Sequence, residues 1–303
     1  MSSALEWIAV DWGTSNVRAW GIGAEGDVHF TRESPEGMGK LQPGDYLGVL
    51  DRLVTNELEG GAGTDVLICG MAGARQGWRE AKYLEAPTRL DALLAGSVSP
   101  DGTQPKYNVK ILPGICQRDG EDVMRGEETQ LLGLLSMRPS YEGPVIMPGT
   151  HSKWVEIIDG RVERFSTVMT GELYEALSTA TVLRHSLNGE LMGPATEDGV
   201  WTGMGAGLDN PELLTSLLFR TRAAALLSGK GPDWCSGYLS GLLVGTEIAS
   251  HRDWIEGGAI PVIGSARLGR IYTAAFNRIG VGAEPIDAAE ATLAGLKAAR
   301  KAA

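Results

Sequence analysis

One stretch of this sequence occurs twice, and the repeat constrains the fold more than any other feature of the chain. The first copy reads VDWGTSNVRAW from Val10, the second reads MPGTHSKWVEI from Met147, and their Gly-Thr pairs lie 136 positions apart. In each copy an apolar run ends in Gly-Thr, a second strand-like run follows, and a tight turn leads to a third. Because the pattern occurs only twice, it indicates a duplicated half-domain rather than a solenoid.

The two Gly-Thr pairs predict sites for phosphate. Glycine lets the backbone approach a ligand closely, and the threonine hydroxyl and nearby amides can donate to phosphate oxygens. Two such turns facing one another would form a phosphate clamp. We expect the strand pairs to turn at 24–27 and 159–161, and each copy to end on a glycine-containing bend, in ESPEGMG from Glu33 and in VMTGE from Val168.

The rest of the chain predicts an α/β protein with two mixed sheets, because strand-like and helix-like segments alternate. Apolar runs predict strands at 7–10, 17–22, 28–31, 65–70, 109–115, 145–147 and 260–264. Helical patterns begin near Asp45, Glu127, Pro211, Cys235 and Asp287. Residues 86–105 predict a loop or lid, and 139–144 predict a hinge. We expect an N-terminal lobe at 1–140, a C-terminal lobe at 141–286, and a last helix at 287–303 that returns to the first lobe.

Composition excludes several classes of partner. The chain has 303 residues and a formal charge of −11, so its surface on average repels nucleic acid and anionic membranes. No apolar run approaches the length of a membrane span. The three cysteines are widely spaced and the N-terminus lacks a basic, apolar leader, which together indicate a reducing cytoplasm.

Asp11 is the first candidate for chemistry, because it ends the first predicted strand beside Gly13 and Thr14. A carboxylate there can hold Mg²⁺, directly or through water, next to the phosphates of a nucleotide. The alternative is an Asx turn that caps the strand. The second Gly-Thr copy favours phosphate binding over that alternative.

The second copy offers Thr150 as the other half of the clamp, within PGTHSK at 148–153. Lys153 could meet a phosphate as a point charge, or it could be an ordinary strand lysine with its head in solvent. We expect His151 to be a turn residue rather than a catalytic one.

The segment DVMRGEETQLLG places Arg125, Glu127 and Glu128 at a predicted helix start. Acids in a first helical turn complement the helix dipole, which is the structural interpretation. The functional interpretation is that one of them orients or deprotonates a substrate hydroxyl. We favour Glu127, because Glu128 is one position round the helix and should point elsewhere. Asp11 is the other candidate base.

Two further turns follow buried strands. GMAGARQGW, from Gly70 to Trp78, contains Met71, Ala72 and Arg75; its glycines suggest close backbone approach to a ligand, and the arginine could grip a carboxylate. VIGSARLGR could support a base or an α-phosphate on Gly264, Ser265 and Ala266, because ligands bind beyond the carboxyl ends of such strands. A plain helix start is the alternative in both cases.

Taken together, VDWGTSNVRAW, ICGMAGARQGW, RGEETQLLG, MPGTHSKWVEI, TVMTGELYEAL, LSGLLVGTEI and VIGSARLG resemble the 2-dehydro-3-deoxygalactonokinases. These are sugar-acid kinases of the actin-like ATPase superfamily. The resemblance runs over nearly the whole chain. MPGTHSKWV followed by MTGELYEAL is specific to the family, whereas D-x-G-T-S is shared by the superfamily.

The resemblance implies two ribonuclease-H-like lobes with ATP between them, and transfer of the γ-phosphoryl group to the terminal hydroxyl of 2-dehydro-3-deoxy-galactonate. It places the first phosphate motif at Asp11–Ser15, the second at Gly149–Ser152 and the adenosine motif at Gly264–Ala266. Many sugar kinases of the superfamily have an Asp base where this chain offers Glu127. Arg75, with Arg18 and Arg125 as further candidates, would meet the sugar-acid carboxylate.

Two other functions fit the same motifs. The Glu127–Glu128 pair also suits a phosphohydrolase of this superfamily, acting on polyphosphate or a nucleotide. A nucleotide-switched binding or filament protein would need an exposed apolar surface, which the sequence does not make obvious. For the kinase we expect ATP and Mg²⁺ as cofactors, a small sugar acid as substrate, and a chain that could form a homo-oligomer.

Overall fold

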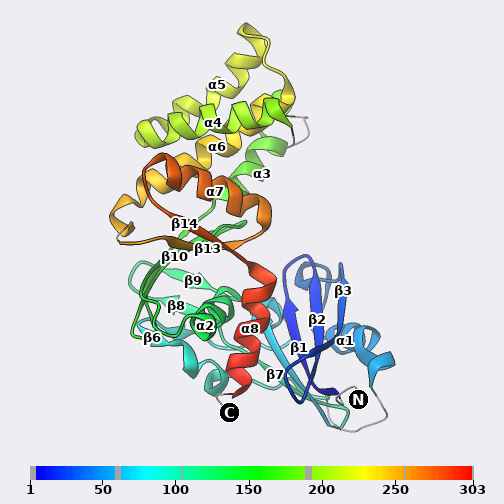
Figure 1. The fold of residues 1–303 in the computed structure, drawn as a ribbon. Helices are drawn as coiled ribbons and strands as arrows, with labels where there is room; N and C mark the ends of the chain where they lie inside the picture. The colour runs from blue at the N-terminus through cyan, green and yellow to red at the C-terminus, as the bar shows by residue number, and fades with distance from the viewer. Residues whose placement is uncertain (1–4, 59–62, 104, 188–192, 256, 302–303) are drawn as a thin grey trace. The chain divides into compact units, whose positions relative to one another are not determined.

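The computed structural model describes residues 5–58, 63–103, 105–187, 193–255 and 257–301 (Figure 1). The chain forms two compact units. Unit 1 comprises 1–142, 157–165 and 288–303, and unit 2 comprises 143–156 and 166–287. The lobe boundaries expected from the sequence remain a prediction.

Unit 1 is built on a five-stranded mixed sheet with the order β3-β2-β1-β4-β7. The strands are β1 (Leu5–Trp12), β2 (Val17–Gly23), β3 (Val28–Ser34), β4 (Thr64–Gly70) and β7 (Tyr107–Ile111). β1, β2 and β3 pair antiparallel, whereas β4 and β7 continue the sheet in parallel with β1. The strands expected around 7–10, 17–22, 28–31 and 65–70 are thus confirmed, and β7 is shorter than the strand expected at 109–115.

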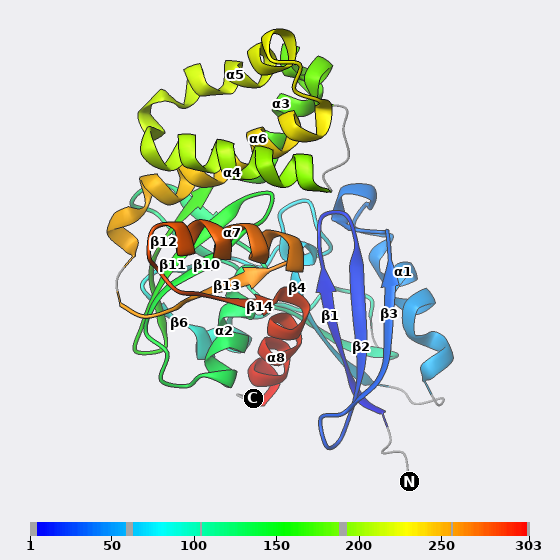
Figure 2. The same cartoon turned by 45° about the horizontal axis from the view of Figure 1, so that its top comes forward.

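Three α-helices accompany this sheet: α1 (Tyr46–Val54), α2 (Glu127–Met137) and α8 (Ala288–Lys301). All three are confirmed sequence predictions. α2 and α8 lie side by side (Figures 1 and 2). A Cβ on Gly133 would lie 1.9 Å from the Ala291 carbonyl oxygen, and one on Gly295 would lie 1.8 Å from that of Thr129. The two helix backbones therefore touch, which only glycine permits.

The remainder of unit 1 is irregular. A small sheet with the order β5-β8-β9 contains Leu84–Glu85, Ile115–Gln117 and Asp122–Met124. The stretch 86–105 is mainly loop, as expected, but its described part also contains β6 (Thr88–Arg89) and two 3-10 turns, η4 (Leu90–Ala92) and η5 (Leu94–Gly96). Further single turns are η1 (Met38–Lys40), η2 (Thr55–Glu57) and η3 (Met71–Gly73).

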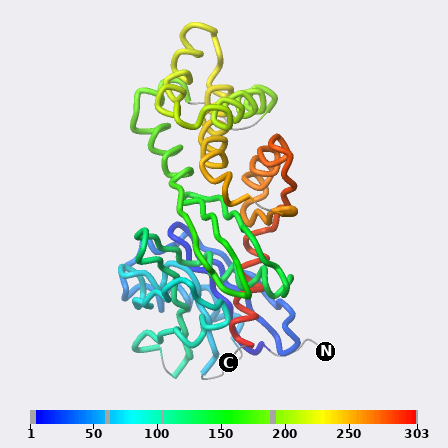
Figure 3. Tube along the Cα trace, turned by 90° about the vertical axis from the view of Figure 1, so that its left-hand side faces the viewer, coloured from blue at the N-terminus to red at the C-terminus, as the bar shows by residue number. Residues whose placement is uncertain are grey.

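A six-stranded sheet has the order β14-β13-β10-β11-β12-β6. Its strands besides β6 are β10 (Gly143–Met147), β11 (Ser152–Ile158), β12 (Arg161–Val168), β13 (Ile260–Gly264) and β14 (Ala283–Asp287). β11 and β12, green in Figure 3, turn at Asp159–Gly160 as the repeat predicts, and each passes from one unit to the other along its length.

Helices make up most of the rest of unit 2. They are α3 (Thr170–Ala180), α4 (Pro194–Asp209), α5 (Leu214–Leu227), α6 (Pro232–Ser250) and α7 (Ala266–Arg278), with 3-10 turns η6 (Val182–Ser186), η7 (Pro211–Leu213) and η8 (Arg252–Trp254). In Figure 2, α7 lies along β13 and β14, with which it is in contact.

Three sequence expectations for unit 2 are corrected, and one helix was not expected. The bend expected in VMTGE is the first turn of α3, because the chain enters a helix directly after β12. α4 has so many glycines that its helical pattern is weak, and we did not predict it. The α-helix expected from Pro211 starts at Leu214 after a 3-10 turn, and the one expected from Cys235 starts earlier, with Pro232 in its first turn. Within the described residues, no helix is long and apolar enough to cross a membrane.

Candidate active site

Asp11 lies at the carboxyl end of β1, paired with Arg18 on β2 and with Cys69 on β4. Its Oδ1 is 3.9 Å from the Cys69 sulfur. Burial raises the pKa of the Asp11 carboxyl, while the charge of Arg18 and the contact with Cys69 act in the opposite direction. A cation beside this carboxylate would offset the cost of its burial.

Asp11 opens into a hollow of about 260 Å³ in unit 1. Its other lining residues come from the first Gly-Thr loop and the strands that flank it: Gly13, Ser15, Asn16, Val17, Arg18 and Glu33. Arg18 Nε donates to Glu33 Oε1 at 2.6 Å, so the arginine is already paired on one side. The hollow is therefore polar, with a carboxylate at its base.

Three backbone hydrogen bonds hold the first Gly-Thr loop. The amides of Gly37, Met38 and Gly39 donate to the carbonyl oxygens of Ser15, Gly13 and Thr14, at 3.1, 3.0 and 2.9 Å. A Cβ on Gly37 would lie 2.3 Å from the Ser15 carbonyl carbon. Segment 37–39 therefore lies directly against the loop and engages its carbonyl groups.

This arrangement leaves the loop amides free. In a trans peptide the N–H points opposite to the C=O, so the amides of Thr14, Ser15 and Asn16 point away from segment 37–39. Among the described residues none of these three amides has a hydrogen-bond acceptor. Successive free amides in a turn are a common binding site for anions. The loop can thus donate several hydrogen bonds to a phosphate.

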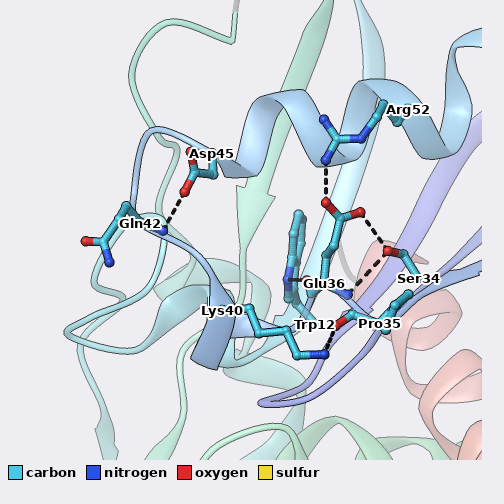
Figure 4. Close-up of polar contacts among 8 residues, drawn as sticks. All are labelled: Trp12, Ser34, Pro35, Glu36, Lys40, Gln42, Asp45 and Arg52. Carbon is cyan, nitrogen blue, oxygen red and sulfur yellow. Dashed lines mark hydrogen bonds and ion pairs between the residues drawn. The ribbon is translucent and has the colours of Figure 1, made fainter.

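Side-chain hydrogen bonds hold segment 34–45 in place (Figure 4). Trp12 Nε1 donates to the Glu36 carbonyl at 3.1 Å, and the Glu36 carboxylate accepts from Ser34 and Arg52. Lys40 Nζ donates to the Pro35 carbonyl at 2.6 Å. The Ser34 hydrogen bond is the largest influence that lowers the pKa of Glu36. The glycine-containing bend expected in ESPEGMG is thus confirmed as the brace of the first loop.

The start of α2 lies beside the ends of β1 and β4. Gly70 has a φ of 85° and Gly126 a φ of 103°, values that favour glycine. A Cβ on Gly70 would lie 2.6 Å from the Trp12 carbonyl oxygen and 3.4 Å from Asp11 Oδ1, and one on Gly126 would lie 3.5 Å from Gly70 Cα. The two glycines let the helix start come close to Asp11.

Both glutamates of α2 cap its first turn. Glu127 Oε2 accepts from the Arg125 amide at 2.9 Å, and Glu128 Oε2 accepts from the Gly126 amide at 2.7 Å. Glu128 is fully buried, whereas Glu127 is partly exposed. Both glutamates therefore fit the structural interpretation, which is a role at the helix start. Only Glu127 is accessible to solvent.

Glu128 belongs to a group of buried acids. Burial, and secondly the charge of Glu127, raises the pKa of Glu128 to about 8. Burial, Asp11 and Glu128 raise the pKa of the Cys69 thiol well above its usual value. The sequence did not predict a role for either residue, and Glu128 was expected to point elsewhere on the helix. The pairing of parallel β4 with β1 brings Cys69 to Asp11, and the start of α2 brings Glu128 to Cys69.

The candidate substrate arginines differ in surroundings. Arg125 lies over the Tyr83 ring at 4.4 Å and donates to the Ala81 carbonyl at 2.8 Å. Its Nε and Nη1 are buried with no hydrogen-bond partner among the described residues, and Gly73 of η3 adjoins Nη1. Arg75 is exposed. Of the two other residues expected at the substrate, Met71 is half-buried and Ala72 is buried.

In unit 2 the second Gly-Thr loop follows β10 and meets the start of α3. The Glu172 amide donates to the Thr150 carbonyl at 2.9 Å, and a Cβ on Gly171 would lie 2.5 Å from the Gly149 carbonyl oxygen. His151 pairs with Glu172 on the surface. Thr150 is exposed, so its hydroxyl is available to a ligand at a helix N-terminus.

Ser152 and Lys153 face the protein instead. Lys153 is buried and its Nζ donates to Thr167 on β12 at 2.7 Å, so its head is not in solvent. Ser152 Oγ lies 3.2 Å from the hydroxyl of Tyr272 on α7. These two side chains connect the loop to its own unit.

Glu247 of α6 completes that support. Its carboxylate accepts from Trp154 Nε1 at 2.8 Å, from the Tyr272 hydroxyl at 2.7 Å and from Thr170 at the start of α3. Burial raises the pKa of Glu247, and these hydrogen bonds oppose the shift. We did not single it out, although a lone acid in the apolar segment LSGLLVGTEI was a signal.

The expected adenosine motif adjoins the same loop. Gly264 ends β13, and a Cβ there would lie 3.4 Å from Pro148. Ser265 caps α7, accepting from the Leu268 amide at 3.4 Å. Ala266 is the first residue of the helix. The helix-start interpretation therefore holds here, and the motif and the second loop lie together in unit 2.

The described residues contain no group of three or more His, Cys, Asp or Glu side chains that could bind an ion. Asp11 instead offers a single carboxylate beside the free amides of the first loop. Mg²⁺ is commonly bound by one or two carboxylates together with substrate phosphates and water, and this donor set fits that mode.

Comparison with known proteins identifies the family. The model of the 2-keto-3-deoxy-galactonokinase family matches residues 11–299. The chain belongs to this family. A 2-dehydro-3-deoxygalactonokinase of Rhizobium meliloti strain 1021 is 41% identical over 100% of this chain and 99% of its own, and one of Escherichia coli strain K12 is 36% identical over 96% of each.

Comparison with solved structures agrees with this family assignment. A 2-dehydro-3-deoxygalactonokinase protein from Sinorhizobium meliloti has a TM-score of 0.89 and 41% identity, covering 98% of this chain and 96% of its own. Component A of the (R)-2-hydroxyglutaryl-CoA dehydratase of Acidaminococcus fermentans has a TM-score of 0.52 at 10% identity, covers 98% of each chain and shows a likeness of fold alone. The family resemblance and the α/β fold expected from the sequence are thus confirmed, as is a phosphotransferase with an alcohol acceptor.

Proposed function

We propose that this kinase transfers the γ-phosphoryl group of ATP to the terminal 6-hydroxyl of 2-dehydro-3-deoxy-D-galactonate, a step of galactonate breakdown in the cytoplasm. The main observation behind this proposal is the first Gly-Thr loop beside Asp11. Its carbonyl groups accept hydrogen bonds from segment 37–39, and its amides at Thr14, Ser15 and Asn16 are free. In a chain of this family, such a loop is suited to the phosphates of a nucleotide. The names of the full-length relatives support the choice of sugar acid.

Each loop has its own part in nucleotide binding. Thr14 and Ser15 would donate from unit 1, where Gly13 lets the backbone come close while its amide donates to the Asn16 carbonyl at 2.9 Å. Gly149 and Thr150 would donate from unit 2, with Gly264–Ala266 near the adenosine. The role of Lys153 is reduced to positioning, because its amine is bonded to Thr167. His151 would adjust the second loop through Glu172. Ser152 would hold that loop to Tyr272.

Mg²⁺ would be held at Asp11, where it would neutralise phosphate charge. Burial raises the pKa of Asp11, and a cation bound there would act in the opposite direction. The carboxylate would thus bind metal and nucleotide together. Positioning and charge neutralisation account for most catalysis of phosphoryl transfer.

The acceptor hydroxyl would be oriented by Glu127, which is partly exposed at the start of α2. Glu128 is buried with a pKa of about 8, so it is mostly protonated at neutral pH and adds little negative charge beside the phosphates. Arg75 is exposed and has no carboxylate partner among the described residues, so it is the best candidate to bind the sugar-acid carboxylate. Arg18 is paired with Glu33, and Arg125 is packed on Tyr83.

A coupled assay of ADP release with a panel of 2-oxo-3-deoxy sugar acids tests the proposal. We expect turnover with 2-dehydro-3-deoxy-D-galactonate and a 6-phosphate product, identified by mass spectrometry and NMR. Phosphate release at the same rate without an acceptor would instead identify a phosphohydrolase. ATP binding without turnover on any sugar acid, combined with ATP-dependent assembly, would identify a nucleotide-switched binding protein.

A further inference from the structure

Helix α5 carries an apolar face that no other part of the described chain covers. Nine of its 14 residues are Ala, Leu or Phe, yet Leu217 and Thr221 are its only fully buried ones. Phe219, Leu226 and Leu227 are 60%, 64% and 86% exposed. Figures 1 and 2 show α5 on the outer side of α4 and α6, away from the strands of unit 2. A helix apolar on all sides is normally buried.

The exposed residues form one ridge. At 100° per residue, Phe219, Ala223, Leu226 and Leu227 share a face, and Leu217 and Thr221 lie on the opposite one. Large side chains thus stand four residues to either side of Ala223. A ridge with a small residue at its centre is self-complementary, because two copies crossing antiparallel at Ala223 place Phe219 of each against Leu227 of the other.

The helix dipoles favour the same pairing. Residues 213–232 contain no Asp or Glu, but they include Arg220, Arg222 and Lys230. Asp209 and Glu212 precede the helix. Antiparallel pairing would oppose the two helix dipoles. The overall charge of −11 disfavours the alternative of an anionic membrane.

The three exposed side chains would supply the apolar centre of a dimer interface, which is less than half of its area. At roughly 150 Å² for a fully exposed large apolar side chain, Phe219, Leu226 and Leu227 offer about 300 Å² in each copy. A standard interface buries about 800 Å² per partner, with an apolar centre and a polar rim. Arg220, Arg222 and the polar residues of α5 would supply part of that rim.

We propose that the α5 face is a homodimer interface, in which two copies of this chain pair antiparallel through a two-fold axis at Ala223. The occupant of the face is therefore a second copy. This proposal does not depend on the proposed substrate, because it concerns only the assembly of the protein.

The first test is the mass in solution, measured by sedimentation velocity and light scattering across roughly 1 to 100 µM protein. We expect twice the chain mass of 32.1 kDa for the wild type, and 32.1 kDa for the double variant Leu226→Glu, Leu227→Glu. The control Val28→Glu changes a side chain of unit 1 that is 43% exposed, and it should stay dimeric. Circular dichroism and Tm check that the variants fold.

The second test is cross-linking. Ala223→Cys should form an intermolecular disulfide under mild oxidation, because helices that cross at small residues bring the two Cα atoms within bonding range. Thr215→Cys is the control, since its two copies would be roughly 24 Å apart along the helices. Its thiols should not react with one another.

Three results would overturn the proposal: a wild type that is monomeric throughout, a dimer that survives the double variant, or a dimer that cross-links at Thr215→Cys and not at Ala223→Cys. Flotation with vesicles of anionic phospholipid tests the alternative that a membrane covers the α5 face. A monomer that floats through Leu226 and Leu227 would identify the face as a membrane contact instead.

Discussion

The two Gly-Thr loops are copies in sequence, but the protein holds them by different means. Segment 37–39 holds the first loop with three backbone hydrogen bonds to consecutive carbonyl groups. The second loop is held by the start of α3 and by the side chains of Ser152, Lys153 and Glu172. Asp11 in the first copy corresponds to Met147 in the second. The two copies therefore share the turn, but only the first has the Asp11 carboxylate, and different contacts hold each loop.

Asp11→Asn tests the largest difference between the loops, the presence of a carboxylate in only one of them. The variant should lower kcat at least about 100-fold if Asp11 anchors the metal, and it should raise the Mg²⁺ concentration needed for half-maximal rate. Asp45→Asn is the control, because its side chain only accepts from the Gln42 amide. Wild-type turnover in Asp11→Asn would remove this residue from the site.

The buried glutamates beside the two loops differ as well. Glu247 accepts from three side chains, whereas Glu128, with a pKa of about 8, accepts from the Gly126 amide and the Thr129 hydroxyl. A pKa raised in the folded state means that folding binds a proton between the unfolded and folded pKa values. The contribution of Glu128 to stability is therefore fully present below about 4.5 and lost as the pH rises to about 8.

Glu128→Gln mimics the protonated form and should remove that loss. Relative to wild type, it should gain on the order of 3 kcal/mol in the free energy of unfolding between pH 5 and pH 8. Urea titrations at a series of pH values measure the gain. The exposed Glu25→Gln should show no such change, and equal pH slopes for wild type and Glu128→Gln would refute an ionisation held back by burial.

Gly37→Ala tests the backbone brace of the first loop. The added Cβ would lie 2.3 Å from the Ser15 carbonyl carbon and 2.4 Å from the Thr14 oxygen, so the loop must shift. We expect kcat/KM for ATP to fall about 20-fold, with a loss of about 2 kcal/mol in the free energy of unfolding. Gly44→Ala is the matched control, since a Cβ there meets nothing within 4 Å. Unchanged ATP kinetics in Gly37→Ala would show that the brace is dispensable.

Gly171→Ala makes the equivalent change at the second loop. Its Cβ would lie 2.5 Å from the Gly149 carbonyl oxygen, but alanine also favours the helix that it would join. We therefore expect a smaller fall in kcat/KM for ATP, about 5-fold. Gly231→Ala, at the start of α6 with open space around it, should behave as wild type. A larger effect at Gly171 than at Gly37 would reverse the comparison.

Glu172→Gln should have the smallest effect. The His151–Glu172 pair is about half exposed, with 48% of each side chain accessible, and such pairs contribute little. The Glu172 amide, which holds Thr150, is unaffected by the change. We expect less than a 3-fold change in kcat/KM for ATP by steady-state assay. A 10-fold loss would mean that His151 itself contacts the nucleotide.

The sequence predicts the elements that depend on local pattern and misses the contacts that depend on register. The apolar runs of β1, β2 and β4 and the amphipathic α1 were readable from their periodicity. The Gly-Thr repeat also located the two loops. The proximity of Cys69 to Asp11 was not readable, because it follows from parallel pairing of distant strands.

The contacts that hold the two loops could not be predicted from the sequence either. Backbone hydrogen bonds from 37–39 carry no side-chain signature beyond two glycines, and α4 hides its helical period behind its glycines. Glu247 is visible in the sequence as a lone acid in an apolar helix, but its partners come from three other elements. The sequence shows such an acid without showing what surrounds it.

The burial of Cys69 affects how well the enzyme keeps its activity under oxidative stress. Peroxide and alkylating reagents attack the thiolate, and burial beside two carboxyl groups keeps this sulfur in the thiol form. A sulfenic acid at this position would place a polar group against Asp11 and damage the centre. Burial beside Asp11 and Glu128 therefore shields the cysteine of this site from inactivation.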